Sequence, residues 1–303
     1  MKIAFLGIGL MGGPMVENLL NAGFPLTLWN RTRVKAEKYA ERATIASTPA
    51  EAVNNADIII TMLENGPVVE EVLTTGGVVG ACKPGAMLID MSSIPPTSAR
   101  QHAEQLDKVH CRYLDAPVSG GTVGAAQATL SIMVGGSQAD YQLAQPVFAA
   151  LGKSTYIGPT GSGQLAKLAN QAIVGITIGA VSEALLLAAQ GGANPEAVRE
   201  ALMGGFASSR ILELHGQRMI ERNFMPGARA RVQLKDLRMI LDEARAENLT
   251  LPLSQRVYDE YLSLVNTINP NVDHSGLLLQ LESLNHVRLN DQPVQAPISD
   301  SHS

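Results

Sequence analysis

The start of the chain carries the pattern of a strand, a glycine-rich turn, a helix and a second strand. An apolar run at Ile3–Leu6 leads into Gly7, Gly9 and Gly12, which have the spacing G-x-G-x-x-G and open an amphipathic stretch. In such a turn the first glycine permits the sharp bend, the second lets a pyrophosphate approach the backbone, and the third lets helix and strand pack closely. The helix N-terminus adds unpaired N–H groups that favour phosphate. The pattern therefore predicts a dinucleotide-binding fold, with a glycine loop that binds no ligand as the alternative.

The residues after the second strand bear on which dinucleotide is bound. Sites selective for NAD usually place an acidic residue there, about 20 residues after the glycines, where it accepts hydrogen bonds from the ribose 2′-hydroxyl. This chain has Asn30 at that position, followed by Arg31, Thr32 and, one helical turn on, Lys35. An arginine can pair bidentately with a 2′-phosphate and lie flat against adenine. The sequence therefore favours NADP, with an arginine that only caps a surface strand as the alternative.

Apolar runs of strand length alternate with helical stretches through the first half of the chain. Their ranges are 58–62, 87–90, 113–116, 130–134 and 155–157. This alternation predicts an α/β fold, a doubly wound Rossmann domain with a mostly parallel sheet. Because such sheets bind ligands at the carboxyl ends of their strands, the residues at the ends of these runs or shortly after them should face a cofactor crevice. These residues are Met62, Leu63, Ser92, Ser93 and Ser119.

Beyond residue 158 the pattern becomes helical. A glycine-rich break at 158–163 precedes a long run without proline that ends at Gly191-Gly192, which predicts one long helix. Helical periods recur up to residue 265, and the last residues carry prolines and few apolar side chains, as disordered segments do. The predicted parts are an NADP-binding Rossmann domain at 1–161, a long interdomain helix at 162–192, an all-helical C-terminal domain at 193–289 and a disordered tail at 290–303.

Length and composition narrow the class of protein. A chain of 303 residues exceeds the usual span of one hydrophobic core, which agrees with two domains. With 17% charged residues, a net charge of −5 and no basic cluster, we expect neither nucleic acid nor an anionic membrane as a partner. The cysteines, Cys82 and Cys111, lack the spacing of a metal site or a disulfide framework. Since the N-terminus also lacks a signal-peptide pattern, we expect a cytoplasmic protein.

One apolar segment, 172–189, is long enough to raise the question of a membrane span. Glu183 and several small residues interrupt it. A helix that is apolar all round is usually buried in a large protein or at a subunit interface. We therefore expect a homodimer or homotetramer and not a membrane protein.

The candidate for acid–base chemistry is Lys167, at the start of the long helix. Asn170 and Gln171 follow it at i+3 and i+4 and share its helix face. A lysine held where water is largely excluded can protonate a substrate carbonyl as hydride arrives, or take the hydroxyl proton in the reverse direction. A solvated lysine near a helix start is the alternative, and spacing alone does not decide between the two.

Four segments together resemble the β-hydroxyacid dehydrogenase (3-hydroxyisobutyrate dehydrogenase-like) family, and the resemblance covers nearly all of residues 1–288. They are the glycine turn at 7–15, Asp-Ala-Pro-Val-Ser-Gly-Gly at 115–121, Gly-Ser-Gly at 161–163 with Lys167, and Lys-Asp-Leu at 235–237. The resemblance implies that Lys167 is the catalytic lysine, that Ser93 contacts the nicotinamide end and that Lys235 closes over the cofactor. The implied partner is a small-molecule carboxylate substrate.

These considerations define two sets of candidate site residues. The expected substrate-binding residues are Ser119, Gly120, Gly121, Asn170, Gln171 and Asp236. The expected cofactor-binding residues are Gly7, Gly9, Leu10, Met11, Gly12, Asn30, Arg31, Thr32, Lys35, Met62, Leu63, Ser93 and Lys235. A serine hydroxyl and the backbone N–H groups of flexible glycines suit an anion, which agrees with a carboxylate at Ser119.

Within the family, segments 167–171, 222–227 and 273–275 resemble the subgroup that reduces 2-hydroxy-3-oxopropionate (tartronate semialdehyde). Two positions differ: Ala228 stands where relatives often have an aromatic residue, and Arg231 where they often have an acidic one. The shape and charge of the pocket should differ accordingly. The resemblance implies an NADP-dependent enzyme that reduces 2-hydroxy-3-oxopropionate to D-glycerate.

Other activities remain as alternatives. Reduction of glyoxylate or succinic semialdehyde, and oxidation of 3-hydroxyisobutyrate or serine, occur in the same family. The related 6-phosphogluconate dehydrogenases have a histidine where this chain has Ala169, and imine reductases generally lack the lysine. A non-catalytic NADP-binding protein would keep the fold without turnover.

Asp273 and His274 are adjacent and suggest a catalytic triad, but the sequence has no activated serine elbow. A helix start capped by Asp273 or Ser275 is the simpler interpretation. We expect no metal, because no cluster of His, Asp or Glu has the sequence spacing of a metal site.

Overall fold

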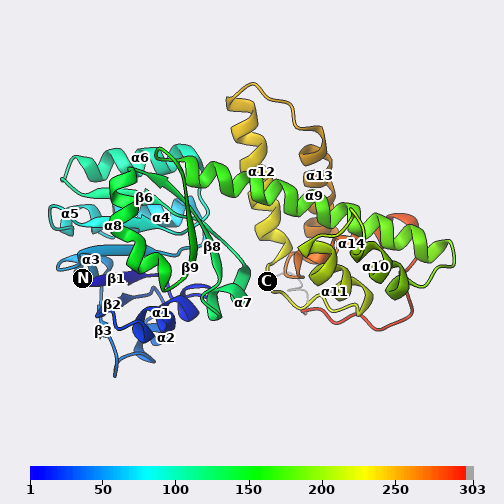
Figure 1. The fold of residues 1–303 in the computed structure, drawn as a ribbon, viewed down its shortest axis with the longest axis horizontal. Coiled ribbons are helices and arrows are strands. Elements are labelled where there is room, and N and C mark those ends of the chain that lie inside the picture. The colour runs from blue at the N-terminus through cyan, green and yellow to red at the C-terminus, as the bar shows by residue number, and fades with distance from the viewer. Residues whose placement is uncertain (298–303) are drawn as a thin grey trace. The chain divides into compact units, whose positions relative to one another are not determined.

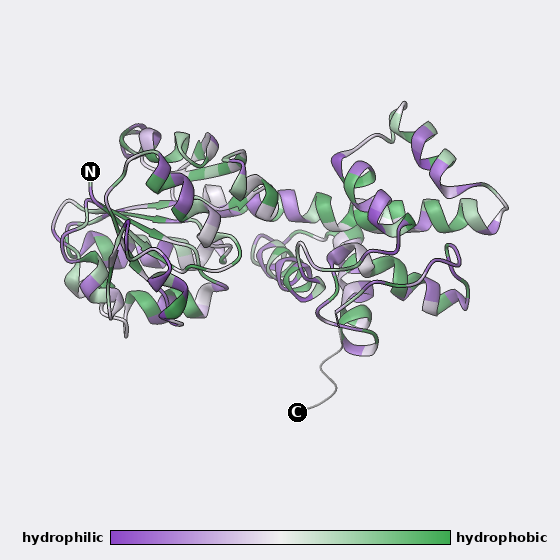
Figure 2. Ribbon diagram, turned by 90° about the horizontal axis from the view of Figure 1, so that it is seen from below, coloured by the Kyte–Doolittle hydropathy of each residue, from purple (hydrophilic) through white to green (hydrophobic). Residues whose placement is uncertain are grey.

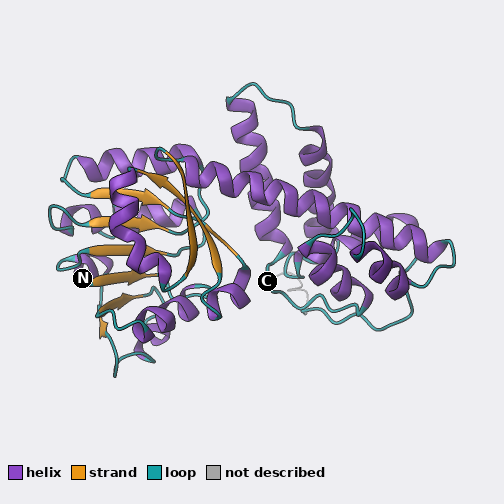
Figure 3. Cartoon of the chain, viewed as in Figure 1, coloured by secondary structure: helices purple, strands orange, loops and turns teal. Residues whose placement is uncertain are grey.

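The structure, a computed structural model, describes residues 1–297, which form two compact units. The first unit ends at Lys167 and the second begins at Leu168. All strands of the described chain lie in the first unit, whereas the second consists of helices and loops (Figure 3). This arrangement confirms the predicted Rossmann domain with a mostly parallel sheet, followed by an all-helical domain.

The sheet of the first unit has nine strands in the order β3-β2-β1-β4-β5-β6-β8-β7, with β9 paired to β8 (Figure 1). The strands from β3 to β6 are parallel, and their order reverses between β1 (Ile3–Leu6) and β4 (Ile58–Thr61). Ligands bind at such a reversal, outside the carboxyl ends of the strands. The other strands are β2 (Leu26–Trp29), β3 (Thr44–Ile45), β5 (Met87–Asp90), β6 (Arg112–Asp115), β7 (Val118–Ser119), β8 (Leu130–Gly136) and β9 (Gly152–Gly158).

Helices cover both faces of this sheet, because its central strands carry apolar side chains on both sides. Ile3 and Phe5 of β1 pack with residues of α1, α7 and α8 in one cluster, whereas Ala4 and Leu6 pack with α3, α4, α5 and α6 in another. Figure 2 shows the resulting run of hydrophobic residues along the strands. The helices are α1 (Gly12–Asn21), α2 (Val34–Glu37), α3 (Pro49–Val53), α4 (Gly66–Leu73), α5 (Val78–Ala81), α6 (Pro96–Asp107), α7 (Gly121–Ala126) and α8 (Gln138–Ala149).

The long helix α9 (Ser162–Gln190) begins in the first unit and continues into the second. Gly175 lets α12 approach it closely, because a Cβ there would lie 2.8 Å from Gln233 Nε2. A π-helical turn, η1, directly precedes α11 in the second unit. The second unit contains α10 (Pro195–Met203), η1 (Leu212–Gly216), α11 (Gln217–Ile220), α12 (Ala230–Ala246), α13 (Pro252–Thr267), η2 (His274–Gly276) and α14 (Leu277–Asn285).

Helix α9 is long and apolar enough to cross a membrane by length and composition, a test that core helices also pass. Ile178 and Leu185 are buried in the apolar core of the second unit. Ile173 and Leu187 are 67% and 77% exposed. The helix is thus a core element on one side and presents apolar surface on another.

Residues 290–297, expected to be disordered, are instead hydrogen-bonded to the helical unit. The Gln295 carbonyl accepts from Phe224 N (2.7 Å), and Gln295 N donates to the Arg222 carbonyl (2.9 Å). Asn269 Nδ2 donates to the Pro297 carbonyl (2.9 Å). Composition could not reveal these bonds, because segment 290–297 makes them with its backbone N–H and carbonyl groups, which do not depend on residue type. The remainder of the predicted tail, 298–303, lies outside the described residues.

Candidate functional site

The glycine turn joins β1 to α1 and lies against the backbone that follows β4. Gly7 has φ +107°, and a Cβ there would lie 2.3 Å from the Met62 carbonyl oxygen. A Cβ on Gly12 would lie 2.0 Å from the Gly7 carbonyl oxygen, whereas no described atom lies within 4 Å of one on Gly9. Leu10 is 72% exposed. Gly7 and Gly12 therefore allow close packing, and Gly9 leaves the backbone open, as a pyrophosphate requires.

Asn30, which follows β2, ties that strand to the glycine turn. Its Oδ1 accepts from Ile8 N (2.8 Å), and its Nδ2 donates to the Thr32 carbonyl (2.9 Å). Arg31 and Lys35 are exposed beside it. Asn30 thus holds the conformation of the turn, a role that its spacing did not show, while the neighbouring cations can reach an anionic ligand.

Asp90, the last residue of β5, organises the ends of β4 and β5. It is fully buried, and its Oδ1 accepts from Thr61 Oγ1 (2.8 Å) and Ser92 N (2.9 Å). Ser92 Oγ in turn accepts from Leu63 N (2.9 Å). Burial raises the pKa of Asp90, although the bonds from Ser92 and Thr61 oppose the rise. This network fixes the two strand ends that the sequence predicted to face the cofactor.

Lys167 is half-buried, and its Nζ donates to the Val118 carbonyl (2.9 Å). Val118 and Ser119 form β7, and the chain then turns through Gly120 and Gly121, with φ +128° and φ +61°. Such angles favour glycine. The structure therefore brings the predicted lysine together with the predicted anion-binding turn, far apart in the sequence but within one unit.

Asp115, at the end of β6, binds the first turn of α9. Its Oδ1 accepts from Gly161 N (2.8 Å) and its Oδ2 from Gln164 N (2.9 Å). This approach requires a glycine on β8, since a Cβ on Gly135 would lie 2.5 Å from Asp115 Oδ1. Burial raises the pKa of Asp115 to about 6, against the opposing effect of the two N–H donors. Asp115 lies in a segment that carried the family resemblance, but no sequence signal joined it to α9.

Gln164 was missed by the sequence analysis. Its side chain is buried, its Nε2 donates to the Ser92 carbonyl (2.9 Å) and its Oε1 accepts from Ile94 N (3.2 Å). A glutamine in the first turn of a helix has no sequence signature that separates this arrangement from a solvated side chain.

The second unit holds its own polar cluster on α9 and α12. Gln171 Nε2 donates to Asp236 Oδ2 (2.7 Å), and Asn170 Nδ2 donates to Gln171 Oε1 (2.9 Å). Lys235 Nζ lies 3.2 Å from Asp236 Oδ1. Gln233, which the sequence analysis did not single out, donates to the Gln171 carbonyl (3.0 Å) and is 1% exposed. The predicted residues of this unit thus form one hydrogen-bonded group.

His215, Asp273 and His274 have potential metal-ligand atoms within 4.8 Å of one another, a group that sequence spacing did not reveal. The carboxylate is already occupied by donors, and Arg218 Nε lies 3.6 Å from Asp273 Oδ1, which opposes a cation. The donors are Gly227 N, Ala228 N, Ser275 N and Ser275 Oγ. Burial lowers the pKa of His274 to about 4. Asp273 caps the η2 turn, as predicted.

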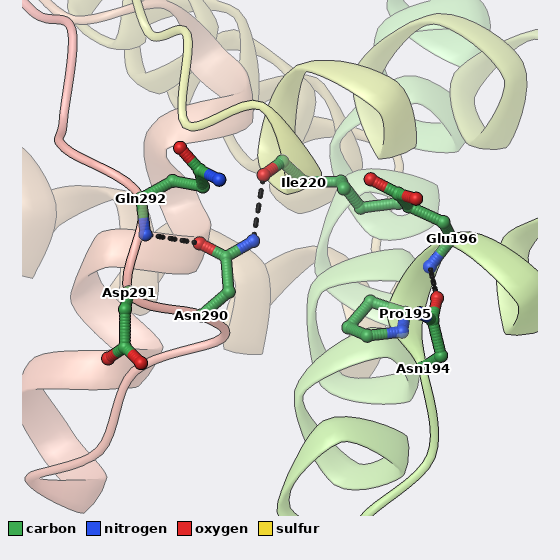
Figure 4. Close-up of a pocket in the computed structure, with 7 residues that line it drawn as sticks. All are labelled: Asn194, Pro195, Glu196, Ile220, Asn290, Asp291 and Gln292. Atoms are coloured by element: carbon green, nitrogen blue, oxygen red, sulfur yellow. Dashed lines mark hydrogen bonds between the residues drawn. The ribbon is translucent and has the colours of Figure 1, made fainter.

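A cavity of about 340 Å³ lies between the start of α10 and the segment at 290–292. Figure 4 shows that its polar side chains serve local structure: Asn194 caps α10 by accepting from Glu196 N (2.9 Å), and Asn290 donates to the Ile220 carbonyl (2.8 Å). No group in it is arranged for the chemistry that Lys167 could perform. The lining residues are Asn194, Pro195, Glu196, Ile220, Asn290, Asp291 and Gln292.

Comparison with known proteins agrees with this geometry. Residues 2–158 match the NAD binding domain of 6-phosphogluconate dehydrogenase, and residues 161–281 match the NAD-binding domain of NADP-dependent 3-hydroxyisobutyrate dehydrogenase. The chain is 44% identical to 2-hydroxy-3-oxopropionate reductase of Escherichia coli over 94% of this chain and 99% of that protein. It is 32% identical to NAD-dependent L-serine dehydrogenase of Pseudomonas aeruginosa over 87% of this chain and 92% of that protein. The structure of 3-hydroxyisobutyrate dehydrogenase from Mycobacterium tuberculosis with L-serine aligns with a TM-score of 0.86 and 31% identity, covering 92% and 98% of the two chains.

The chain therefore belongs to the 3-hydroxyisobutyrate dehydrogenase-like family of β-hydroxyacid dehydrogenases, as its sequence motifs predicted. It is an oxidoreductase that uses a nicotinamide dinucleotide and acts on CH–OH groups. Within the family, 2-hydroxy-3-oxopropionate reductase is among the relatives to which it is most similar.

Proposed function

We propose that this protein is an NADP-dependent reductase that converts 2-hydroxy-3-oxopropionate to D-glycerate, with Lys167 as the general acid. The observation that carries the proposal is the hydrogen bond from Lys167 Nζ to the Val118 carbonyl (2.9 Å), because it holds the ammonium group beside the Ser119–Gly121 turn. The 44% identity to the reductase from Escherichia coli supports this choice of substrate.

The glycine turn and the exposed cations after β2 suit NADP. The open backbone at Gly9 would accept the pyrophosphate, with Leu10 and Met11 beside it, and Arg31 and Lys35 would pair with a 2′-phosphate. The ends of β4 and β5, with Met62, Leu63 and Ser93, would line the nicotinamide side, and Lys235 would close over the cofactor. When bound, the cofactor supplies the hydride.

For the substrate, we assign the carboxylate to Ser119, Gly120 and Gly121, whose hydroxyl and backbone N–H groups suit an anion. Asn170 and Gln171 follow Lys167 by one turn of α9 and would orient the substrate oxygens. Asp236 hydrogen-bonds Gln171 (2.7 Å) and would hold that amide in place.

The proton step belongs to Lys167. As a carbonyl carbon gains hydride, its oxygen becomes an alkoxide, and the ammonium group donates a proton to it. In the oxidative direction the neutral amine accepts the hydroxyl proton. The bond to the Val118 carbonyl limits the positions that Nζ can take, so the proton is presented in a defined direction.

The test of the proposal is Lys167→Ala. We expect a loss of kcat of about 10²- to 10⁴-fold with 2-hydroxy-3-oxopropionate and NADPH, while the dissociation constant of NADPH, measured by fluorescence, stays within about threefold. Lys153→Ala, which changes an exposed lysine of the same unit, is the control. Retained turnover in the Lys167 variant would overturn the catalytic role and would favour a protein that binds NADP without using this lysine.

Substrate and cofactor preference are tested separately. The panel is 2-hydroxy-3-oxopropionate, glyoxylate and succinic semialdehyde with NADPH or NADH, and 3-hydroxyisobutyrate, L-serine and D-glycerate with NADP or NAD. We expect the highest kcat/KM for the first, and Arg31→Ala should weaken NADPH binding more than NADH binding. Equal weakening of both cofactors would contradict the role of Arg31.

We also propose that the protein assembles as a homodimer or homotetramer in the cytoplasm. Ile173 and Leu187 lie fourteen residues apart on α9, nearly four full turns, so their exposed side chains share one stripe. A second subunit would cover this apolar stripe. Light scattering at micromolar concentration should give at least a dimer, and a monomer would contradict the assignment.

A further inference from the structure

Gln164 makes a paired contact with the backbone on either side of Ser93. Its Nε2 donates to the Ser92 carbonyl (2.9 Å) and its Oε1 accepts from Ile94 N (3.2 Å). The amide thus bonds the segment as a neighbouring strand would, with one donor and one acceptor. Gln164 is 1% exposed, so water does not compete for either bond.

The backbone of Gln164 is held as firmly as its side chain. Its N–H donates to Asp115 Oδ2 (2.9 Å), and Gly161 N donates to the other oxygen of that carboxylate (2.8 Å). The first turn of α9 is therefore tied to the ends of both β5 and β6. Lys167 lies three residues further along the same helix, on the same face as Gln164.

We propose that Gln164 is a positioning residue that fixes the Ser93 segment relative to Lys167. The nicotinamide, which donates the hydride, and Lys167, which donates the proton, can then both reach the carbonyl group of one substrate molecule. The inference rests on the proposed function, in which Ser93 lies at the nicotinamide end and Lys167 is the general acid. A displacement of about 1 Å between reacting groups can cost a factor of about 100 in rate.

The site requires a side chain that both donates and accepts a hydrogen bond, which an uncharged amide does. A glutamate in its place has the same length and can still accept from Ile94 N, but as a carboxylate it cannot donate to the Ser92 carbonyl and would repel it. When protonated, the same glutamate regains a donor and restores both bonds. Activity of a Gln164→Glu variant should therefore be rescued by acid.

Charged groups on the adjoining elements bear on this titration. Asp115 on β6 accepts from the Gln164 backbone, and Asp90 on β5 accepts from Ser92 N. Arg100 on α6 lies beside Gly161, and Lys167 lies on α9 itself. The two carboxylates and the burial of the site should keep the carboxyl group of the Gln164→Glu variant protonated well above the usual pH range for a glutamate side chain.

The experiment compares kcat of Gln164→Glu with that of the wild type as a function of pH. At pH about 8 we expect a loss of about 30- to 100-fold, and at pH about 5.5 recovery to within about threefold of the wild type. The dissociation constant of NADPH should stay within about threefold throughout. Gln164→Leu, which has no polar group, should lose activity at every pH and show no rescue. If the glutamate variant is too unstable to purify, Gln164→Asn should lose about tenfold in kcat, independent of pH.

Two outcomes would overturn the proposal. One is a kcat for Gln164→Glu that stays within about threefold of wild type at pH about 8, and the other is an equal loss at all pH values, which would mark a purely structural role. The Lys167→Ala measurement separates this failure from that of the proposed function. If Lys167→Ala is inactive and Gln164→Glu is not impaired, only the positioning role of Gln164 is wrong. If Lys167→Ala is active, both the catalytic role of Lys167 and the positioning role of Gln164 are wrong.

Discussion

Asp115 in the first unit and Asp273 in the second are both buried carboxylates that bind backbone N–H groups at the start of a helix, yet their pKa values shift in opposite directions. Asp115 receives two backbone N–H bonds from α9, and burial raises its pKa to about 6. Burial alone would also raise the pKa of Asp273, but its neighbours lower it well below the usual range. Burial by itself therefore does not decide how a carboxylate behaves.

The difference lies in what faces each group. Asp273 lies beside His215, whose Nδ1 is 3.6 Å from Asp273 Oδ1 and which does most to lower the pKa of Asp273. Asp273 also accepts four hydrogen bonds, and the guanidinium of Arg218 lies 3.6 Å away. Asp115 instead faces a second carboxylate, Asp90, across the paired ends of β5 and β6. Donors and a cation stabilise the charged form, whereas a like charge destabilises it. The charged form of Asp273 is thus strongly stabilised and holds the surrounding backbone firmly. The charged form of Asp115, at the sheet edge that carries the candidate site, is less stable and holds α9 less firmly.

The largest expected effect is that of Asp273→Ala. The substitution removes a buried carboxylate and leaves its four hydrogen-bond donors and Arg218 without their acceptor, so the free energy of unfolding should fall by about 3–5 kcal/mol. Urea denaturation followed by circular dichroism measures it. Asp242→Ala, which removes an ion pair with Arg245 at 2.5 Å on the surface, is the control and should cost less than about 0.5 kcal/mol. A small effect at Asp273 would remove the contrast with Asp115.

A smaller effect concerns pH. Because the pKa of Asp115 rises from 3.8 to about 6 on folding, the folded protein binds that proton more tightly, and its contribution to stability falls as pH rises from about 4 to about 6. The size is about 3 kcal/mol. His274 acts in the opposite sense, since burial lowers its pKa from 6.5 to about 4 and its contribution is lost as pH falls through that range.

Subtracting the pH dependence of Asp115→Asn from that of the wild type isolates the carboxylate, because His274 contributes to both curves. The difference in unfolding free energy should change by about 3 kcal/mol between pH about 4 and pH about 6 and should be flat above about 7. If this difference in unfolding free energy does not change with pH, the pKa of Asp115 is the same in the folded and unfolded protein, which would contradict the prediction.

The smallest effect is that of Ser275→Ala. The hydroxyl of Ser275 donates to Asp273 Oδ1 (2.7 Å), so its loss removes one of four donors and leaves the others in place. We expect a loss of about 1.5–3 kcal/mol in unfolding free energy, typical of one hydrogen bond to a charged group. A loss as large as that of Asp273→Ala would mean that the donors act as one unit and not in proportion to their number.

The elements of the first unit were predictable because their signals are local. Strands buried on both faces appear as apolar runs, and the glycine spacing marks a turn whose geometry allows no Cβ at Gly7 or Gly12. The lysine and the Ser119–Gly121 turn were found through motifs, but only the fold brings Nζ to the Val118 carbonyl. Gln164 and Gln233 were missed because a buried glutamine that bonds backbone has the same sequence context as a solvated one.

The order of residues alone determined the succession of strands and helices, the glycine turn, the family and the candidate lysine, since each depends on the residues within one element or one short motif. Only the tertiary structure shows which strand ends lie together and that Asn30 hydrogen-bonds the glycine turn. It also shows that Asp115 and Gln164 join α9 to the sheet and that segment 290–297 is hydrogen-bonded to the helical unit. Those contacts join residues dozens of positions apart, and hydrogen bonds to backbone groups leave no trace in residue type. Their energies depend on burial and on neighbouring charges, which exist only once the chain has folded.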